Sequence, residues 1–231
     1  MKKIYFVTGI DTGTGKSVAT GLMARYLRNR GENAATLKMV QTGNVGKSED
    51  VEVHRRLMGV GELTEDRWGW SAPQIFKFPA SPHLAAALEG RRVDTGAILE
   101  GLRKMSERFD TILVEGAGGL AVPLTEEVLT GDFVREQGWP VILVASDKLG
   151  SLNHTLLSLE FLRNRQMSLA GVVYNRFCGE SPLIGDDTRR MISIYLERYG
   201  FTPKLAETGK IDMEDEGAAG ADFGAIFGEE K

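Results

Sequence analysis

A glycine-rich segment close to the amino terminus restricts which fold this chain can adopt more than any other sequence feature does. Residues 9–17 read Gly-Ile-Asp-Thr-Gly-Thr-Gly-Lys-Ser and separate two patterned segments. Residues 4–8 are apolar and rich in β-branched and aromatic side chains, which predicts a buried strand, and residues 17–30 have the spacing of an amphipathic helix that ends at Gly31. Glycines allow backbone N–H groups to turn toward phosphate oxygens, and a helix start adds a favourable dipole. The segment therefore predicts a phosphate-binding loop.

Two side chains at the end of this loop suit a nucleoside triphosphate. Lys16 can place a positive charge on the β- and γ-phosphates, and Ser17 can offer its hydroxyl to magnesium. The spacing departs from G-x-x-x-x-G-K-S/T by one residue, since the first glycine is Gly9 and residue 10 is isoleucine. A glycine-rich turn that carries a lysine by chance is the alternative, but strand, loop and helix all agree with nucleotide binding.

Strand and helix patterns alternate along the chain. Strands are expected at residues 4–8, 34–40, 111–114, 141–145 and 169–174, and helices at 17–30, 49–58, 82–89, 95–108, 152–164 and 187–199. This alternation predicts one α/β domain, residues 1–231, with a mostly parallel sheet and helices on both faces. Glycine, alanine and acids dominate residues 214–228, so 210–231 is expected to be a weakly ordered acidic tail.

Composition excludes several functional classes. The 231 residues are 42% hydrophobic and 26% charged, as in globular proteins, and a net charge of -4 argues against a nucleic-acid surface. No stretch has the length of a membrane span, and the start lacks the apolar run of a signal peptide. The single cysteine, Cys178, excludes an intrachain disulfide and is expected to be inert. A cytoplasmic location is therefore expected.

Charged residues at predicted strand ends are candidates for the metal and the phosphates. Glu115 ends the apolar run 111–114, at the sheet edge where phosphates bind in open α/β folds, and the glycines after it allow close backbone approach. Asp50 is a second candidate metal ligand or, equally, an acid that stabilises a helix start. Lys38 ends the second predicted strand, either as a solvated charge or as a second cation beside the phosphoryl group.

Three polar residues are interpreted as structural or surface groups. His54 and His154 lie on helical patterns, where surface or structural roles are expected. Ser81 precedes a proline at a predicted helix start and is expected to cap that helix.

Further motifs follow one another over the larger part of the chain. They are residues 6–12 with Gly15-Lys16-Ser17, Lys38 with Gln41-Thr42-Gly43, Asp50, Ser81-Pro82-His83, 114–119, 140–144, 148–154 and Asn175. Together these motifs resemble dethiobiotin synthetase, and the Lys-Leu-Gly-Ser-Leu-Asn-His stretch at 148–154 is the most specific. The longer phosphate-binding loop is itself a feature of that family.

The resemblance implies a reaction, with ATP as co-substrate and Mg²⁺ as cofactor. Members of this family join carbon dioxide to 7,8-diaminononanoate. One amine forms a carbamate, whose oxygen attacks the γ-phosphate to give a carbamic–phosphoric anhydride. The second amine then closes the cyclic urea and releases phosphate.

The resemblance also implies a role for each matching position. The metal ligands would be Ser17, Asp50 and Glu115, and the catalytic residues Lys16, Lys38 and Thr12. The nucleotide would be held by Gly13, Thr14, Gly15, Lys16, Ser17 and Val18, with Asn175 at the adenine. The diamine end would contact Thr12, Lys38, Thr42 and Gly118, and its carboxylate tail would reach Gly150, Ser151, Leu152 and Asn153 of the second subunit in a homodimer.

The sequence departs from the family pattern in three places. Gly13 stands where some members have an acid, and Ser17 replaces the commoner threonine. The Gly-Glu-Ile-Pro-like stretch that helps to form the base pocket corresponds here to residues 205–209, which contain no proline. Selectivity for adenine is therefore left open, whereas triphosphate binding is not.

Other classes of P-loop protein fit less well. A partition or cell-division ATPase switch, the main alternative, carries a signature lysine where this chain has Asp11. A regulatory GTPase would read guanine with Asn-Lys-x-Asp, but Asn175 is followed by Arg-Phe-Cys. An amidotransferase-type synthetase would need a glutaminase domain, for which the chain has no room.

Overall fold

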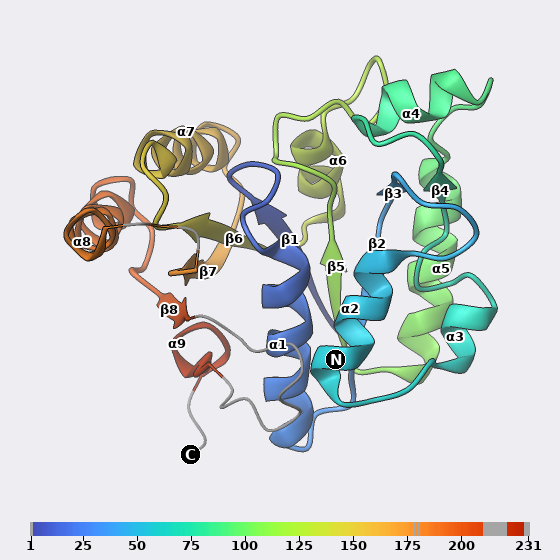
Figure 1. The fold of residues 1–231 in the computed structure, drawn as a ribbon, viewed down its shortest axis with the longest axis horizontal. Coiled ribbons are helices and arrows are strands. Elements are labelled where there is room, and N and C mark those ends of the chain that lie inside the picture. The colour runs from blue at the N-terminus through green and yellow to red at the C-terminus, as the bar shows by residue number, and fades with distance from the viewer. Residues whose placement is uncertain (1, 178, 180, 210–220, 229–231) are drawn as a thin grey trace.

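A six-stranded, fully parallel sheet forms the centre of the protein (Figure 1). The computed structural model describes residues 2–177, 179, 181–209 and 221–228. The strands are β1 (Lys3–Gly9), β2 (Ala34–Lys38), β5 (Thr111–Glu115), β6 (Val141–Ser146), β7 (Leu169–Asn175) and β8 (Leu205–Thr208), in the order β2-β5-β1-β6-β7-β8. This confirms the predicted fold class.

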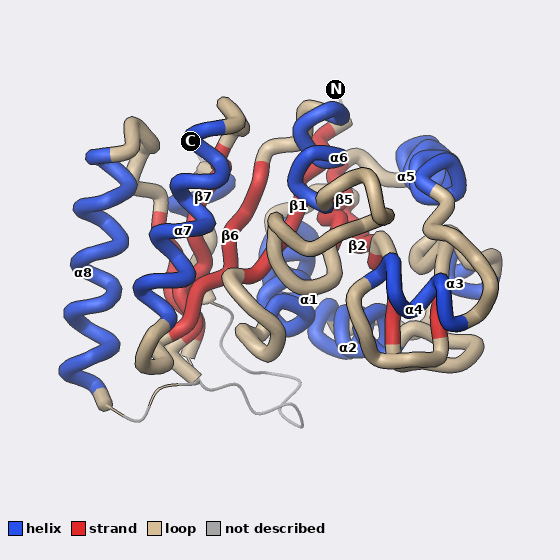
Figure 2. The backbone as a smooth tube through the Cα atoms, turned by 90° about the horizontal axis from the view of Figure 1, so that it is seen from above, coloured by secondary structure: helices blue, strands red, loops and turns tan. Residues whose placement is uncertain are grey.

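Helices cover both faces of the sheet (Figure 2). On one face lie α1 (Lys16–Asn29), α2 (Glu49–Met58) and the short α9 (Gly224–Phe227). On the other face lie α5 (Thr95–Arg108), α6 (Thr130–Gln137), α7 (Ser151–Asn164) and α8 (Pro182–Arg198). Two short helices, α3 (Thr64–Arg67) and α4 (Pro82–Leu88), and the small parallel pair β3 (Gln41–Thr42) and β4 (Ile75–Phe76) lie beyond the β2 edge.

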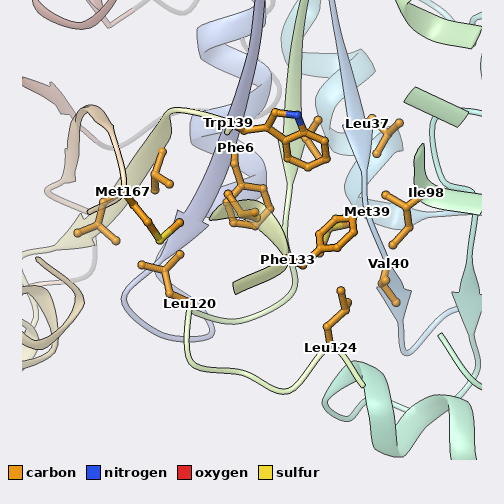
Figure 3. Packing of buried hydrophobic residues seen from close by; sticks show 14 of the residues in the cluster. Phe6, Leu37, Met39, Val40, Ile98, Leu120, Leu124, Phe133, Trp139 and Met167 are labelled. Carbon is orange, nitrogen blue, oxygen red and sulfur yellow. The ribbon is translucent and has the colours of Figure 1, made fainter. Parts of the chain in front are cut away.

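Alternating side chains of the central strands supply two separate cores. Phe6 of β1 belongs to the core under α5 to α8, whereas its neighbour Val7 belongs to the core under α1 and α2. Both are fully buried, so the strand reads as a continuous apolar run, as parallel strands covered on both faces do. Figure 3 shows Phe6 among the buried residues of the first core, where the rings of Phe133 and Trp139 pack edge to face at 5.8 Å.

The parallel arrangement collects the carboxyl ends of β1, β2 and β5 at one edge. Lys38 and Glu115 are register partners at the ends of β2 and β5, and Val7 of β1 pairs with Glu115. Directly after Glu115, Gly116 lies over the core: a Cβ there would be 2.5 Å from the Phe6 ring. The packing of Gly116 against Phe6 therefore fixes the position of the backbone directly after Glu115.

Several elements differ from the sequence expectations. The second strand ends at Lys38 rather than at residue 40, because the chain then turns into β3. Helix α8 starts at Pro182, ahead of the expected residue 187. Residues 205–208, expected to follow the last strand, form the edge strand β8, whose residues are alternately half-buried and buried. Ser81 precedes α4 as expected, but its side chain makes no capping hydrogen bond.

The described part of the predicted tail docks on the protein. Phe223 is fully buried, its ring 5.7 Å from that of Tyr26 on α1, and Ile226 joins the same core. Residues 210–220 and 229–231, and Cys178, lie outside the described residues, so those expectations stay predictions. Within the described part of the chain, no helix has both the length and the apolar composition needed to cross a membrane.

Candidate active site

The loop between β1 and α1 curls around the side chain of Lys16. The Nζ atom of Lys16 donates to the carbonyl oxygen of Asp11 at 2.9 Å, and the Thr14 hydroxyl donates to the same oxygen at 3.2 Å. Gly15 caps α1 with φ +86°, a conformation that favours glycine. Lys16 is buried, and burial lowers its pKa below the ordinary value, although Glu115 acts against this shift.

A residue at the end of β7, two strands away from β1 in the sheet, contacts this loop. The Nδ2 atom of Asn175, at the end of β7, donates to the Thr14 carbonyl oxygen at 3.0 Å. The same amide lies against Gly15, where an added Cβ would be 2.3 Å from Nδ2. Any side chain at position 15 would therefore displace Asn175 in addition to straining the backbone.

Oxygen atoms of three elements converge beside Lys16. The Ser17 hydroxyl lies 2.7 Å from Asp50 Oδ1 and 3.0 Å from Glu115 Oε1. Ser17 opens α1, Asp50 lies in the first turn of α2 and Glu115 ends β5, so residues far apart in sequence meet here. The donor set fits Mg²⁺, which prefers hard oxygen ligands and keeps several waters. Among the described residues, no group of three or more His, Cys, Asp or Glu forms a competing metal cluster.

Lys38 lies in the same cluster and contacts both carboxylates. Its Nζ atom is 2.6 Å from Asp50 Oδ2 and 2.7 Å from Glu115 Oε1, and it donates to the Gly116 carbonyl oxygen at 3.0 Å. Burial acts to lower the pKa of Lys38, but Glu115 and Asp50 outweigh it and raise that pKa above its ordinary value. Lys38 is therefore not a solvated strand-end charge.

Glu115 is the centre of the cluster and is completely buried. Burial acts to raise the pKa of its carboxyl group, but Lys38 and then His54 outweigh it, so the pKa lies well below its usual range. A carboxylate that stays ionised without solvent is suited to hold a cation.

His54, for which a surface or structural role was expected, is not on the surface. It has no solvent exposure, and its Nε2 atom lies 2.7 Å from Glu115 Oε2. The spacing of Val51, His54 and Leu57 puts all three on the buried face of α2, and this helical periodicity was the available signal. His154, by contrast, is exposed on α7, with Nδ1 3.8 Å from Asp11.

One cavity of about 920 Å³ joins most of the sequence-predicted site. Of the predicted residues, its lining includes Thr12, Gly13, Gly15, Lys16, Ser17, Val18, Lys38, Thr42, Asp50, Glu115, Gly118 and Asn175. Pro79 to Pro82 and Val122 extend it at one end, and Phe177 and Gly209 at the other. Thr14, within the loop, is buried, and its carbonyl oxygen accepts the hydrogen bond from Asn175.

The four predicted tail-binding residues do not line this cavity. Gly150 and Leu152 line a second hollow of about 470 Å³ with Leu149, Leu183, Ile184, Asp187 and Thr188. Ser151 is buried at the first position of α7, where its hydroxyl donates to the Ser146 carbonyl oxygen, and Asn153 is exposed. Within a single chain these four residues therefore lie outside the cavity, although His154 in the same turn of α7 approaches Asp11 of the loop.

Comparison with known proteins shows the family to which this chain belongs. A family model described as an AAA domain matches residues 3–208. The ATP-dependent dethiobiotin synthetase BioD of Chlorobaculum tepidum is 44% identical over 93% of this chain and 88% of its own length. The chain belongs to the dethiobiotin synthetase family.

A second member of the dethiobiotin synthetase family matches similarly. BioD 2 of Pasteurella multocida is 44% identical over 86% of this chain and 93% of its own length.

Among solved structures, the signal recognition particle receptor FtsY of Elizabethkingia anophelis shares 13% identity with a TM-score of 0.54, over 95% of this chain and 62% of that one. FtsY of Thermotoga maritima shares 16% identity with the same TM-score, over the whole of this chain and 69% of that one. At these identities the two FtsY structures show the fold alone.

Proposed function

We propose that this protein is an ATP-dependent dethiobiotin synthetase. It would join carbon dioxide to 7,8-diaminononanoate and close the cyclic urea, with ATP converted to ADP and phosphate. The observation that carries the proposal is the convergence of Lys16, Lys38 and the Ser17–Asp50–Glu115 oxygens on one cavity. Relatives named for this activity match over most of their own length.

The cavity offers a place for each reactant. Its Asn175 end would take the adenine, and the loop of Lys16 would hold the triphosphate. Its Thr42 and Gly118 end would take the diamine, so that the reacting amines lie next to the γ-phosphate. Holding the reactants in one cavity replaces a collision in solution with a reaction of fixed geometry.

The two lysines would stabilise the charges that form during the reaction. Lys16 would lie on the β- and γ-phosphates, and Lys38, held between two carboxylates, would meet the carbamate and the transferring phosphoryl group. Thr12, on the cavity wall, would contact the diamine end. Magnesium, held by Ser17, Asp50 and Glu115, would neutralise phosphate charge.

The purified protein is expected to make dethiobiotin from diaminononanoate, bicarbonate, ATP and Mg²⁺, with one phosphate released per ring closed. The measurement is mass spectrometry of the product with ¹³C-bicarbonate, since the label must enter the urea carbon. Reactions without ATP or with EDTA are the controls. Phosphate release that needs no diamine, with no labelled product, would contradict the proposal and favour the ATPase-switch alternative.

We further propose a cytoplasmic homodimer that acts on small molecules, without nucleic-acid or membrane partners. Exposed Leu149 and Leu183 flank the hollow at the start of α7, where a subunit contact would cover them. Backbone N–H groups at the start of a 14-residue helix suit the carboxylate tail of a substrate bound in the other subunit.

Asn153→Ala is expected to raise KM for the diamine at least about tenfold, as for loss of a hydrogen bond to a charged group. KM for ATP should stay unchanged, because Asn153 lies outside the nucleotide cavity. Steady-state kinetics with each substrate varied in turn are the measurement. Asn164→Ala, at the exposed last residue of the same helix, is the matched control.

A mixing experiment assigns Asn153 to a subunit. When inactive Lys16→Ala and weakened Asn153→Ala proteins exchange subunits, one site of the mixed dimer would carry both lesions and the other neither. Activity should therefore partly recover. No recovery despite demonstrated exchange would mean that Asn153 serves its own subunit or no site.

A further inference from the structure

His54 lies deep between α2 and the sheet edge that carries the charged cluster. It has no solvent exposure, and helices α1 and α2 pack so closely over it that a Cβ on Gly21 of α1 would be 2.8 Å from Leu57 Cβ and 3.2 Å from His54 Cα. The imidazole is therefore held on a packed helix, not on a loop.

The imidazole is directed at one atom of the site. Nε2 lies 2.7 Å from Glu115 Oε2, and because a carboxylate only accepts hydrogen bonds, Nε2 carries the hydrogen. The other ring nitrogen, Nδ1, is buried without a hydrogen-bond partner among the described residues. The polar contact of this side chain is thus with Glu115.

The two oxygens of Glu115 have different partners. Oε2 faces His54, whereas Oε1 faces Ser17 at 3.0 Å and Lys38 at 2.7 Å. The last torsion of a glutamate side chain has only a broad preference, so the carboxylate plane must be fixed by its contacts. The hydrogen bond from His54 to Oε2 fixes the carboxylate plane, and Oε1 then faces the proposed metal site.

We propose that His54 is a positioning residue, which orients the Glu115 carboxylate so that Oε1 can take part in magnesium binding. The inference rests on the proposed metal site but not on the identity of the second substrate. Hydrogen-bond partners that orient metal ligands commonly contribute tenfold or more to metal affinity. A buried histidine kept merely for packing would have no such effect.

A pair of substitutions separates positioning from packing. The amide nitrogen of glutamine can reach the place of the histidine Nε2 atom, whereas the shorter asparagine side chain ends near the place of Nδ1. His54→Asn should therefore break the contact with Glu115, and His54→Gln should keep it. Both variants put an amide into the same buried space.

The readout is the Mg²⁺ concentration that gives half-maximal ATP binding, measured by calorimetry without diamine. His54→Asn is expected to raise it by about 10- to 100-fold. His54→Gln should stay close to the wild type, and ATP binding in EDTA should be equal in all three proteins. Wild-type ring closure is assayed separately, so failure of the proposed reaction would leave this comparison intact.

Two results would overturn the inference. One is an equal Mg²⁺ dependence in folded His54→Asn, His54→Gln and wild-type proteins, or an equal shift in both variants. The other is wild-type ATP binding that does not depend on Mg²⁺, which would also remove the metal site. If His54→Asn does not fold, His54→Leu replaces it, because leucine suits the apolar space beside Leu57 and Met58 and cannot donate to Glu115.

Discussion

Lys16→Ala should abolish ring closure, with a loss in kcat of at least about 100- to 1000-fold, as for removal of one preorganised charge-stabilising donor. Lys16 is buried in the loop, and its amine lies 2.9 Å from the Asp11 carbonyl oxygen. Lys38 cannot replace it, because Asp50 and Glu115 already hold that amine. The fold should persist, since the deleted amine contacts loop backbone and not the core.

The measurement is phosphate release and product formation, with circular dichroism to confirm folding. Lys3→Ala is the matched control, because Lys3 lies at the opposite end of β1 and pairs only loosely, at 3.5 Å, with Glu32. Folded Lys16→Ala protein with near wild-type turnover would show that the loop is not the phosphate site.

Glu115→Gln should weaken Mg²⁺ binding and stability together. The substitution keeps the shape but removes the charge that faces Ser17 and Lys38. The Mg²⁺ requirement should rise at least about tenfold, since groups that only orient a metal ligand already contribute that much. Breaking a buried ion pair typically costs about 3–5 kcal/mol, which lowers the melting temperature of a domain of this size by roughly 6 to 20 °C.

Mg²⁺ titrations of ATP binding and thermal melts without ligand test the two effects separately. Glu136→Gln, an exposed position on α6, makes the same chemical change and should alter neither. A lower melting temperature with an unchanged Mg²⁺ titration would leave Glu115 as a structural partner of Lys38 and His54 alone.

The central strands and the nucleotide loop could be predicted because each is determined by residues that are adjacent in the sequence. Residues 4–8 and 141–145 are continuous apolar runs, and both form strands covered on both faces. Lys38 and Glu115 were expected at one sheet edge because parallel strands end together, and Asp50 was expected beside them from the family resemblance. In the structure Lys38 contacts both carboxylates.

The missed features depend on contacts between distant segments. Strand β8 forms on β7 with only half its residues buried, so residues 205–208 have no strong apolar run. His54 lies on the buried stripe of α2, but only the folded chain places Glu115 opposite its imidazole. The proposed subunit contact at the start of α7 involves a second chain, so the sequence of one chain contains no local pattern for it.

The hydrogen bond from Asn175 to the Thr14 carbonyl oxygen ties the strand that ends at the proposed base pocket to the loop that would hold the phosphates. Gly15 supplies the space for that amide, so positions 15 and 175 constrain each other. Replacing Asn175 to change the preferred nucleotide base would also remove the hydrogen bond that holds the phosphate loop. Such a replacement is therefore expected to slow catalysis. Variation in base preference is therefore more accessible at Phe177 and Gly209, which line the same end of the cavity.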